Sequence, residues 1–281
     1  MAKILFDIPV VQAPAEWPDC HLVMELSPHI FSYAVVNEDK QLLQLRFYEL
    51  DGRNNKELAD ELDKIIATDE VLYNAKGKRT LVYNFPESHL VPEQYFDSST
   101  GRDMIELLHG DLSRGITLTE KINATAQYNV FRIPEEVHET MKRSFANGKY
   151  WHYYSLWMQC WQKNEEGTAS QLTVMFYPNR ILVGAIKNKE LNLLQSYEYE
   201  AAEDVGYYLL NICDQLGLSP ATVPLFLSGM IDVSSVLYTE IFKYFGNVTM
   251  DATSFQNAEL ALQDYPPHYF TPLLKLALCV S

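Results

Sequence analysis

The stretch "VMFYPNRILVGAI", residues 174–186, decides the fold of this chain. An apolar run enters a tight Pro-Asn turn and a second apolar run leaves it, which predicts a hairpin of two buried strands. The stretch "MELSPHIFSYAVV", residues 24–36, has nearly the same pattern. When Pro28 is set over Pro178, apolar residues alternate on the same strand face in both copies: Phe31, Tyr33 and Val35 in one, and Ile181, Val183 and Ala185 in the other.

The elements after the hairpin also occur twice. Each copy continues with a third strand, a helix, a fourth strand, a second helix and a fifth strand. In the first copy we predict these at residues 41–50, 55–67, 80–85, 101–109 and 127–133. In the second copy we predict them at residues 191–200, 201–217, 223–229, 234–245 and 247–252. The repeated order β-β-β-α-β-α-β indicates a gene duplication.

The repeat divides the chain into two predicted domains. The first spans residues 1–164 and carries an inserted segment near residues 95–125, which has no counterpart in the other copy. The second spans residues 165–281. The polar stretch "NEEGTASQ", residues 164–171, is the predicted link between them.

The charge balance excludes several classes of partner. The chain has 281 residues, with 22 Lys and Arg against 37 Asp and Glu, so its net charge is −15. Such a body repels a phosphate backbone or an anionic lipid surface, because binding there needs clustered Lys and Arg. No apolar run approaches the roughly 18 residues of a membrane span. We therefore expect no nucleic-acid partner and no membrane span.

The cysteines and the N-terminus bear on the location of the protein. Cys20, Cys160, Cys213 and Cys279 are scattered, with no CxxC pair and no His at zinc spacing. Three of them lie in apolar surroundings, which favours reduced, buried thiols. The first 17 residues lack the sustained apolar core of a secretory signal. These features predict a cytoplasmic protein without a metal site.

The duplicated meander of three strands, followed by alternating helices and strands, resembles the actin-like ATPase superfamily, in which each half is a ribonuclease H-like domain. The run "FYPNRILVGAIKNKELNLLQSYEYEAAEDVGYYLLNICDQLGLSPATVPLFLSGMI", with "YFGNVTM" and the ending "PPHYFTPLLKLALC", is similar to an uncharacterised bacterial family, a domain of unknown function with an actin-like ATPase fold. The resemblance covers most of the chain and is strongest from about residue 134 onwards. It implies an α/β fold with a mixed five-stranded sheet and flanking helices in each half, and it implies no activity.

The same resemblance shows where ATP would bind. In active members the first turn of each half carries an acid and glycines, whose N–H groups bind the phosphates while the carboxylate organises Mg²⁺. The first turn of this chain, residues 25–29, keeps an acid but has no glycine, and Pro28 has no N–H group. The second turn, residues 176–179, has neither an acid nor a glycine, and Tyr177 adds bulk. The adenosine motif is half kept, as "LFLSGMI".

These losses predict a non-catalytic adaptor that binds an unidentified protein partner and uses no cofactor. One alternative is an atypical nucleotide-binding protein that holds Mg-ATP or Mg-ADP between the two halves. Its candidate binding residues are Glu25, Ser27, His29, Asn179, Ser228 and Gly229. In that case Glu25 would hold the metal through water and Asn179 would donate to a phosphate. A second alternative is a sensor of an unidentified small molecule, which needs only a closed apolar pocket.

Overall fold

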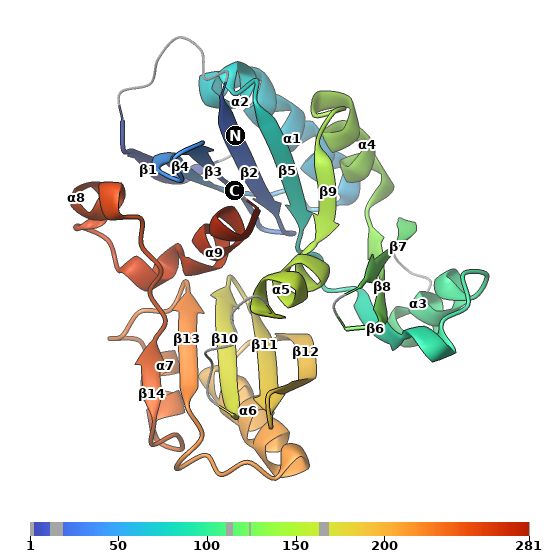
Figure 1. The fold of residues 1–281 in the computed structure, drawn as a ribbon, viewed down its shortest axis with the longest axis vertical. Coiled ribbons are helices and arrows are strands. Elements are labelled where there is room, and N and C mark those ends of the chain that lie inside the picture. Colours follow the sequence, from blue (N-terminus) through green and yellow to red (C-terminus); the bar gives the residue numbers. More distant parts are fainter. Residues whose placement is uncertain (1–2, 12–18, 111–114, 124, 163–168, 281) are drawn as a thin grey trace. The chain divides into compact units, whose positions relative to one another are not determined.

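The computed structural model describes residues 3–11, 19–110, 115–123, 125–162 and 169–280. The chain forms two compact units (Figure 1). The first contains residues 1–163, 255–261 and 276–281, and the second contains residues 164–254 and 262–275. Residues 164–168 of the predicted link lie outside the described residues.

The first unit is built on a six-stranded sheet with the strand order β1-β4-β3-β2-β5-β9. Strands β2, β3 and β4 form the predicted antiparallel meander, and β5 and β9 continue from β2 in parallel. Strand β1 is an additional edge strand that the sequence pattern did not predict. The strands are β1 (Lys3–Pro9), β2 (Cys20–Leu26), β3 (Ile30–Asn37), β4 (Leu42–Glu49), β5 (Lys78–Tyr83) and β9 (Lys149–His152).

The second unit repeats this arrangement in a five-stranded sheet, with the order β12-β11-β10-β13-β14. Its meander is antiparallel, and its last two strands again run parallel to the first. The strands are β10 (Gln171–Tyr177), β11 (Arg180–Lys187), β12 (Glu190–Glu198), β13 (Leu225–Gly229) and β14 (Val248–Met250). The matching strand orders confirm the predicted duplicated α/β fold.

One backbone hydrogen bond recurs at the same place in both halves. In the first, the N–H group of Asn84 donates to the carbonyl of Leu26 over 2.8 Å. In the second, the N–H group of Met230 donates to the carbonyl of Phe176 over 2.9 Å. Leu26 falls on Phe176 when the two proline turns are superposed in sequence. The bond therefore supports the alignment on which the repeat was predicted.

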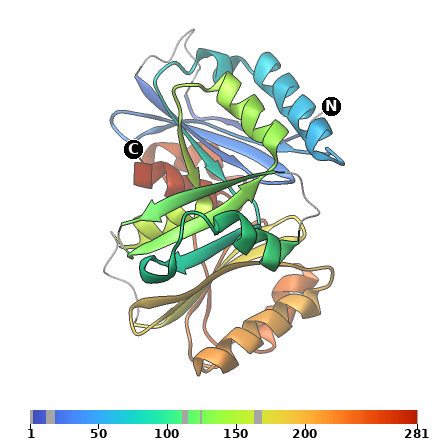
Figure 2. The same ribbon diagram turned by 90° about the vertical axis from the view of Figure 1, so that its right-hand side faces the viewer.

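The helices lie mostly on one face of each sheet. Figure 2 shows α1 and α4 side by side, and the two helices are in contact. The helices are α1 (Asn55–Thr68), α2 (Glu70–Asn74), α3 (Gly101–His109), α4 (Glu135–Ser144), α5 (Tyr153–Gln162), α6 (Ala202–Leu216), α7 (Val236–Phe242), α8 (Glu259–Leu262) and α9 (Thr271–Val280). Short 3-10 turns occupy Glu93–Tyr95, Gln256–Ala258 and Pro267–Tyr269. In the described ranges, no helix combines the length and the apolar character that crossing a bilayer requires.

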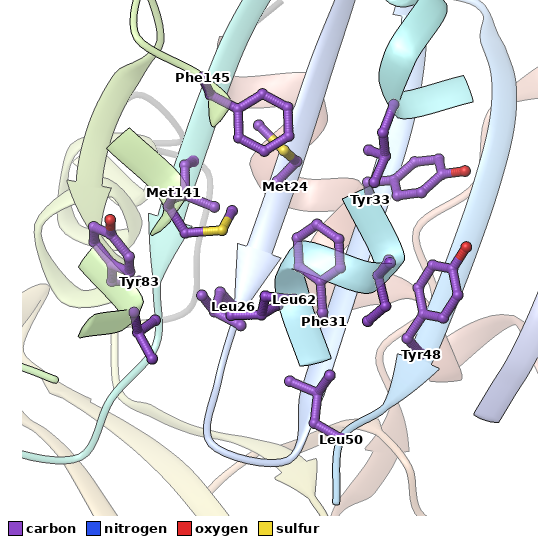
Figure 3. Packing of buried hydrophobic residues seen from close by; sticks show 14 of the residues in the cluster. Met24, Leu26, Phe31, Tyr33, Tyr48, Leu50, Leu62, Tyr83, Met141 and Phe145 are labelled. Carbon is purple, nitrogen blue, oxygen red and sulfur yellow. The ribbon is translucent and has the colours of Figure 1, made fainter. Parts of the chain in front are cut away.

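Apolar alternation places the core of the first unit between its sheet and these helices. Figure 3 shows Phe31 and Tyr33 of β3 packed with Leu62 of α1 and Met141 of α4. Helix α1 begins where the side chain of Asn54 accepts the N–H group of Glu57, over 3.0 Å. In the second unit, Ile181, Val183 and Ala185 occupy the equivalent core positions, as the alignment predicted.

The inserted segment is larger than the sequence pattern indicated. A separate three-stranded sheet, in the order β6-β8-β7, follows β5 and carries α3. Its strands are β6 (Ser88–Pro92), β7 (Ile116–Ile122) and β8 (Gln127–Ile133). The assignment of residues 127–133 as the counterpart of β14 is therefore wrong, because β9 pairs with β5 as β14 pairs with β13. Likewise α4, which packs on α1, takes the place predicted for α3.

A buried polar network holds the inserted sheet against the start of α5. Ser88 donates to the Asn129 side-chain oxygen over 2.7 Å, and the Asn129 amide donates to Ser155 over 3.1 Å. The carboxylate of Glu120 accepts the backbone N–H of His152 over 2.9 Å and is also bound by Ser155. Burial raises the pKa of Glu120 to about 7, although these hydrogen bonds lower it.

This raised pKa predicts a pH dependence of stability. Because the folded protein holds a proton that the unfolded chain would release, the contribution of protonated Glu120 is complete below its ordinary pKa and is lost as the pH rises through about 7. Urea denaturation gives the free energy of unfolding of the wild type and of Glu120→Gln at each pH. Between about pH 5 and pH 8, we expect the wild-type value to fall by about 1–3 kcal/mol more than the value for Glu120→Gln.

The matched control is Glu93→Gln, because Glu93 is exposed on the same inserted segment and pairs with Lys121. This variant should keep the wild-type pH profile. Identical profiles for wild type and Glu120→Gln would contradict the raised pKa.

A second buried network centres on Asp69, whose side chain is fully buried. Its carboxylate accepts the hydroxyl of Tyr33 over 2.8 Å and that of Tyr48 over 2.6 Å, and it pairs with Arg46 over 2.9 Å. The other carboxylate oxygen accepts the N–H group of Val71 and so caps α2. Burial and this carboxylate raise the pKa values of Tyr33 and Tyr48, so both phenols stay protonated donors.

We expect Asp69→Ala to lower the free energy of unfolding by about 3–5 kcal/mol, because it leaves two buried hydroxyls without their acceptor and removes one of the two carboxylates that pair with Arg46, the other being Asp7. Asp63→Ala is the matched control, since it removes an exposed ion pair with Arg143 in the same unit and should cost about 0–1 kcal/mol. Chemical denaturation of both variants gives the comparison. Equal losses would contradict the central role of Asp69.

The cysteines are only partly as predicted. Cys20 and Cys213 are buried thiols outside any disulfide, as expected for structural cysteines. Cys160 of α5 and Cys279 of α9 form a disulfide, which corrects the expectation of reduced thiols for this pair. The two residues are 119 positions apart, so the bond closes a long loop. Closing this loop removes conformational entropy from the unfolded chain and thereby stabilises the folded state.

Candidate functional site

The first hairpin turn connects β2 to β3 and uses most of its own polar groups. The N–H group of Ser27 donates to the carbonyl of Ile30 over 2.9 Å, and the Ser27 hydroxyl accepts the N–H group of Ile30 over 3.1 Å. Pro28 has no N–H group. Of residues 27–30, only His29 could therefore offer a backbone N–H to a phosphate. A phosphate cradle needs several such groups converging on one point, so this turn does not fit one.

Glu25 lies beside this turn on β2 and is 4 % exposed. One oxygen of its carboxylate accepts the side-chain amide of Asn84 over 2.7 Å. Ser32 is the direct cross-strand partner of Glu25. Among the described residues, the Asn84 oxygen and the Ser32 hydroxyl are buried without a hydrogen-bond partner. These two atoms, with Glu25 between them, provide the polar partners that a buried water molecule requires.

The second hairpin turn connects β10 to β11 and is filled by its own side chains. Asn179 is exposed, has a positive φ of 53°, and its carbonyl accepts the N–H group of Tyr199 over 3.0 Å. Tyr177 is 8 % exposed, and the guanidinium of Arg180 lies 5.0 Å from the centre of its ring. Asn179 thus serves as the turn residue that tolerates a left-handed conformation. The large side chain of Tyr177 is buried beside Asn179 in this turn.

The third motif, Ser228-Gly229, ends β13 with both residues buried. Gly229 pairs with Phe176 of β10 and has a positive φ of 82°. A Cβ atom on Gly229 would lie 2.3 Å from the carbonyl oxygen of Phe176. The glycine is therefore required by the close approach of two strands of its own sheet.

This packing predicts a large cost for Gly229→Ala. The variant adds a collision with backbone to the strain of a left-handed conformation, so we expect a loss of about 3 kcal/mol or more in the free energy of unfolding. Gly217→Ala is the matched control, because Gly217 has a φ of 60° and only the end of the Lys187 side chain nearby. It should cost about 1 kcal/mol. Equal costs would contradict the strand-packing explanation.

The structure therefore groups the six predicted residues within their own units. Glu25, Ser27 and His29 lie together at the turn between β2 and β3. Asn179 lies in the turn between β10 and β11, and Ser228 and Gly229 end the strand that pairs with β10. In the first turn the N–H groups of Ser27 and Ile30 are bonded within the turn, and neither Pro28 nor Pro178 has an N–H group.

A cavity of about 250 Å³ lies next to the first turn, wholly within the first unit. His29 lines it and is the one predicted residue among the described lining residues. Its walls come from the first turn, the start of α1, the connection between β5 and β6, and the connection between β8 and α4. The lining residues are Pro28, His29, Gly52, Arg53, Asn54, Asn55, Leu58, Phe85, Pro86, Glu87, Arg132 and Pro134.

Two arginines give the cavity its charge. Arg132 is 5 % exposed, pairs through Nε with Glu87, and donates from Nη2 to the carbonyl of Gly110 over 2.9 Å. Arg53 is exposed at the start of α1. Among the lining residues, two guanidinium groups stand against one carboxylate, so the lining carries one net positive charge, although the chain carries −15 and the Glu57 carboxylate accepts the backbone N–H of Arg53 beside it. The site can therefore attract one negative charge.

Three prolines fix the walls of the cavity. Pro28 lies in the hairpin turn, Pro86 follows β5, and Pro134, with a φ of −53°, precedes α4. A proline ring holds φ near −65°, so these three connections have little freedom. The floor is apolar, because Leu58 and Phe85 are each 5 % exposed. The cavity is thus formed before any ligand arrives.

Sequence reasoning missed the cavity, because its residues come from four separate connections. Arg53 and Arg132 carry no motif, and of the three prolines only Pro28 was singled out as a turn residue. The one local signal was the lack of alternation around "NFPESH", residues 84–89, where a short connection joins two strands of different sheets. No group of three or more His, Cys, Asp or Glu side chains in the described ranges is placed to hold a metal ion.

The chain is similar to one protein family and to several solved structures. The family model described as "Protein of unknown function (DUF3822)" matches residues 13–248. A solved protein from Bacteroides thetaiotaomicron, with an actin-like ATPase fold and unknown function, is 18 % identical; the match covers 88 % of this chain and 96 % of that one, with a TM-score of 0.73. The PilM–PilN type IV pilus biogenesis complex gives 11 % identity, coverage of 93 % and 98 %, and a TM-score of 0.52. No curated protein sequence matches. The fold is therefore the actin-like ATPase fold.

Proposed function

The chain belongs to the family described as "Protein of unknown function (DUF3822)", and we propose that it is a non-catalytic interaction module on an actin-like ATPase fold. In this proposal the fold serves as a docking body for a protein partner. It does not turn over a nucleotide.

One observation carries the proposal: the first turn closes on itself. Ser27 bonds Ile30 through both its N–H group and its hydroxyl, and Pro28 contributes no donor. The position where a phosphate would be held is therefore occupied by bonds within the turn. Gly229, the remaining glycine of the motifs, is explained by the backbone of Phe176. What remains beside the turn is a preformed, positively charged cavity, which suits binding.

The PilM–PilN complex is the model for a docking role, because a body of this fold is there solved together with another protein. At 11 % identity that likeness concerns the fold alone. The second candidate, a sensor of a small molecule, is favoured by the same cavity, since a volume of about 250 Å³ holds a small ligand. Both candidates are binding functions and neither needs a catalytic residue.

A cytoplasmic location stays part of the proposal as a prediction. The disulfide between Cys160 and Cys279 weighs against it, because cytosolic proteins keep most thiols reduced. Cys20 and Cys213 are buried thiols outside any disulfide, which fits either compartment.

The test is a calorimetric titration of the full chain with millimolar Mg-ATP and Mg-ADP, together with melting curves. We expect no binding heat and no shift of the melting temperature, because the turns lack converging donors. A nucleotide at 100 times its dissociation constant would instead stabilise the fold by about 2.7 kcal/mol, which both methods would detect.

Two variants separate a specific effect from a general one. If a shift occurs, is lost in Glu25→Gln and persists in Glu49→Gln, the nucleotide-binding alternative replaces our proposal. Glu49 is a suitable control because it lies on the same sheet and pairs with Lys3 at the surface. Hydrolysis of ATP by the wild type would also overturn the proposal.

A further inference from the structure

The residues that line the cavity beside the first turn restrict the kind of ligand that it can bind. Its floor is formed by Leu58 and Phe85, Arg132 lies buried in its wall, and Arg53 lies exposed at its rim. An apolar floor stabilises a ligand by removing hydrocarbon from water. A guanidinium at the rim recognises a carboxylate or a phosphate. A ligand that uses both the apolar floor and the guanidinium must contain an apolar group and a negatively charged group.

The donors present favour a carboxylate over a phosphate. Three prolines in the walls have no backbone N–H group, and at the start of α1 the N–H groups of Arg53 and Glu57 are already bonded within that turn. Arg132 is already bonded to Glu87 and Gly110, so Arg53 is the guanidinium for which the described residues show no ion pair. One uncompensated positive charge matches a single negative charge. A dianionic phosphate would stay largely unpaired, at a cost in desolvation.

The size of the cavity limits how much of the ligand enters. About 250 Å³ is below the range of pockets that enclose drug-sized molecules, so it fits one or two side chains. His29 and Arg53 are exposed and mark where the cavity meets solvent. A longer ligand can therefore place one short segment in the cavity and continue outside. This is the geometry of a linear peptide anchored by a few side chains.

We infer that this cavity binds an acidic residue next to an aliphatic residue in a partner polypeptide, with the aliphatic side chain on Leu58 and Phe85 and the carboxylate at Arg53. The inference rests on the proposed interaction function and names the chemistry of the partner. The net charge of −15 opposes acidic ligands elsewhere on the chain, so the positive cavity also selects where such a segment docks.

The probe is the capped dipeptide acetyl-Leu-Glu-amide, titrated into the ¹⁵N-labelled full chain and followed by NMR. We expect amide shifts concentrated at His29, Arg53, Asn55 and Glu87. Acetyl-Leu-Gln-amide, which differs only in charge, should bind at least about tenfold more weakly. Isovalerate supplies the same carboxylate and aliphatic group as a free small acid, and it should bind more weakly than the peptide.

Substitutions of Arg53 test whether its guanidinium binds the carboxylate of the peptide. Arg53→Gln should weaken acetyl-Leu-Glu-amide binding about fivefold to tenfold, and Arg53→Lys should restore part of it. Arg143→Gln is the matched control, because it removes an exposed arginine from the same unit, away from the cavity lining. It should leave the peptide affinity unchanged. All of these substitutions lie at exposed positions, so folding is checked by the unperturbed spectrum.

Three results would overturn the inference: equal affinity for the Glu and Gln peptides, no shifts at the cavity at 10 mM peptide, or isovalerate binding as tightly as the peptide. The last would assign the cavity to a free carboxylic acid. These outcomes leave the nucleotide titration untouched, so failure of the inference is distinguishable from failure of the proposed function. Only Mg-ATP or Mg-ADP binding would remove the latter.

Discussion

The same constraint acts in each half of the fold: a backbone hydrogen bond holds the chain after the fourth strand against the end of the hairpin's first strand. Asn84 donates to Leu26 in the first half, and Met230 donates to Phe176 in the second. The bond extends the parallel pairing and brings the chain after that strand beside the hairpin turn. In the second half the approach is so close that Gly229 cannot carry a side chain. The space that would hold a phosphate is therefore shaped by the protein's own backbone.

The fold could be predicted because its repeat is carried by local patterns. Alternation in "IFSYAVV" and "RILVGAI" marks strands whose apolar sides lie in equivalent cores. The error concerned the fifth strand of the first half. Residues 127–133 offer seven strand-forming positions, whereas β9 has four residues and runs directly into the aromatic helix α5. The longer pattern was assigned to the repeat, but pairing with β5 is decided by tertiary contacts that no local pattern records.

The site was less predictable than the fold for a related reason. The losses at the turns were visible, because a proline or a missing glycine has a local meaning at Pro28 and Pro178. The cavity was not, since Arg53 and Arg132 are 79 positions apart and meet only when the inserted sheet is in place. The disulfide between Cys160 and Cys279 was missed likewise, as a separation of 119 residues carries no spacing signal.

The insertion explains why the two halves have come to differ. In the first half, β6, β8 and their connections supply Glu87 and Arg132 beside the hairpin turn, and a cavity remains open there. Among the described residues of the second half there is no such sheet, and the turn there holds Tyr177 with the guanidinium of Arg180 over its ring. One copy keeps the shared scaffold with a closed turn. The other adds new walls around its turn, so a cavity lies beside that turn while the five strands shared with the other half keep their order.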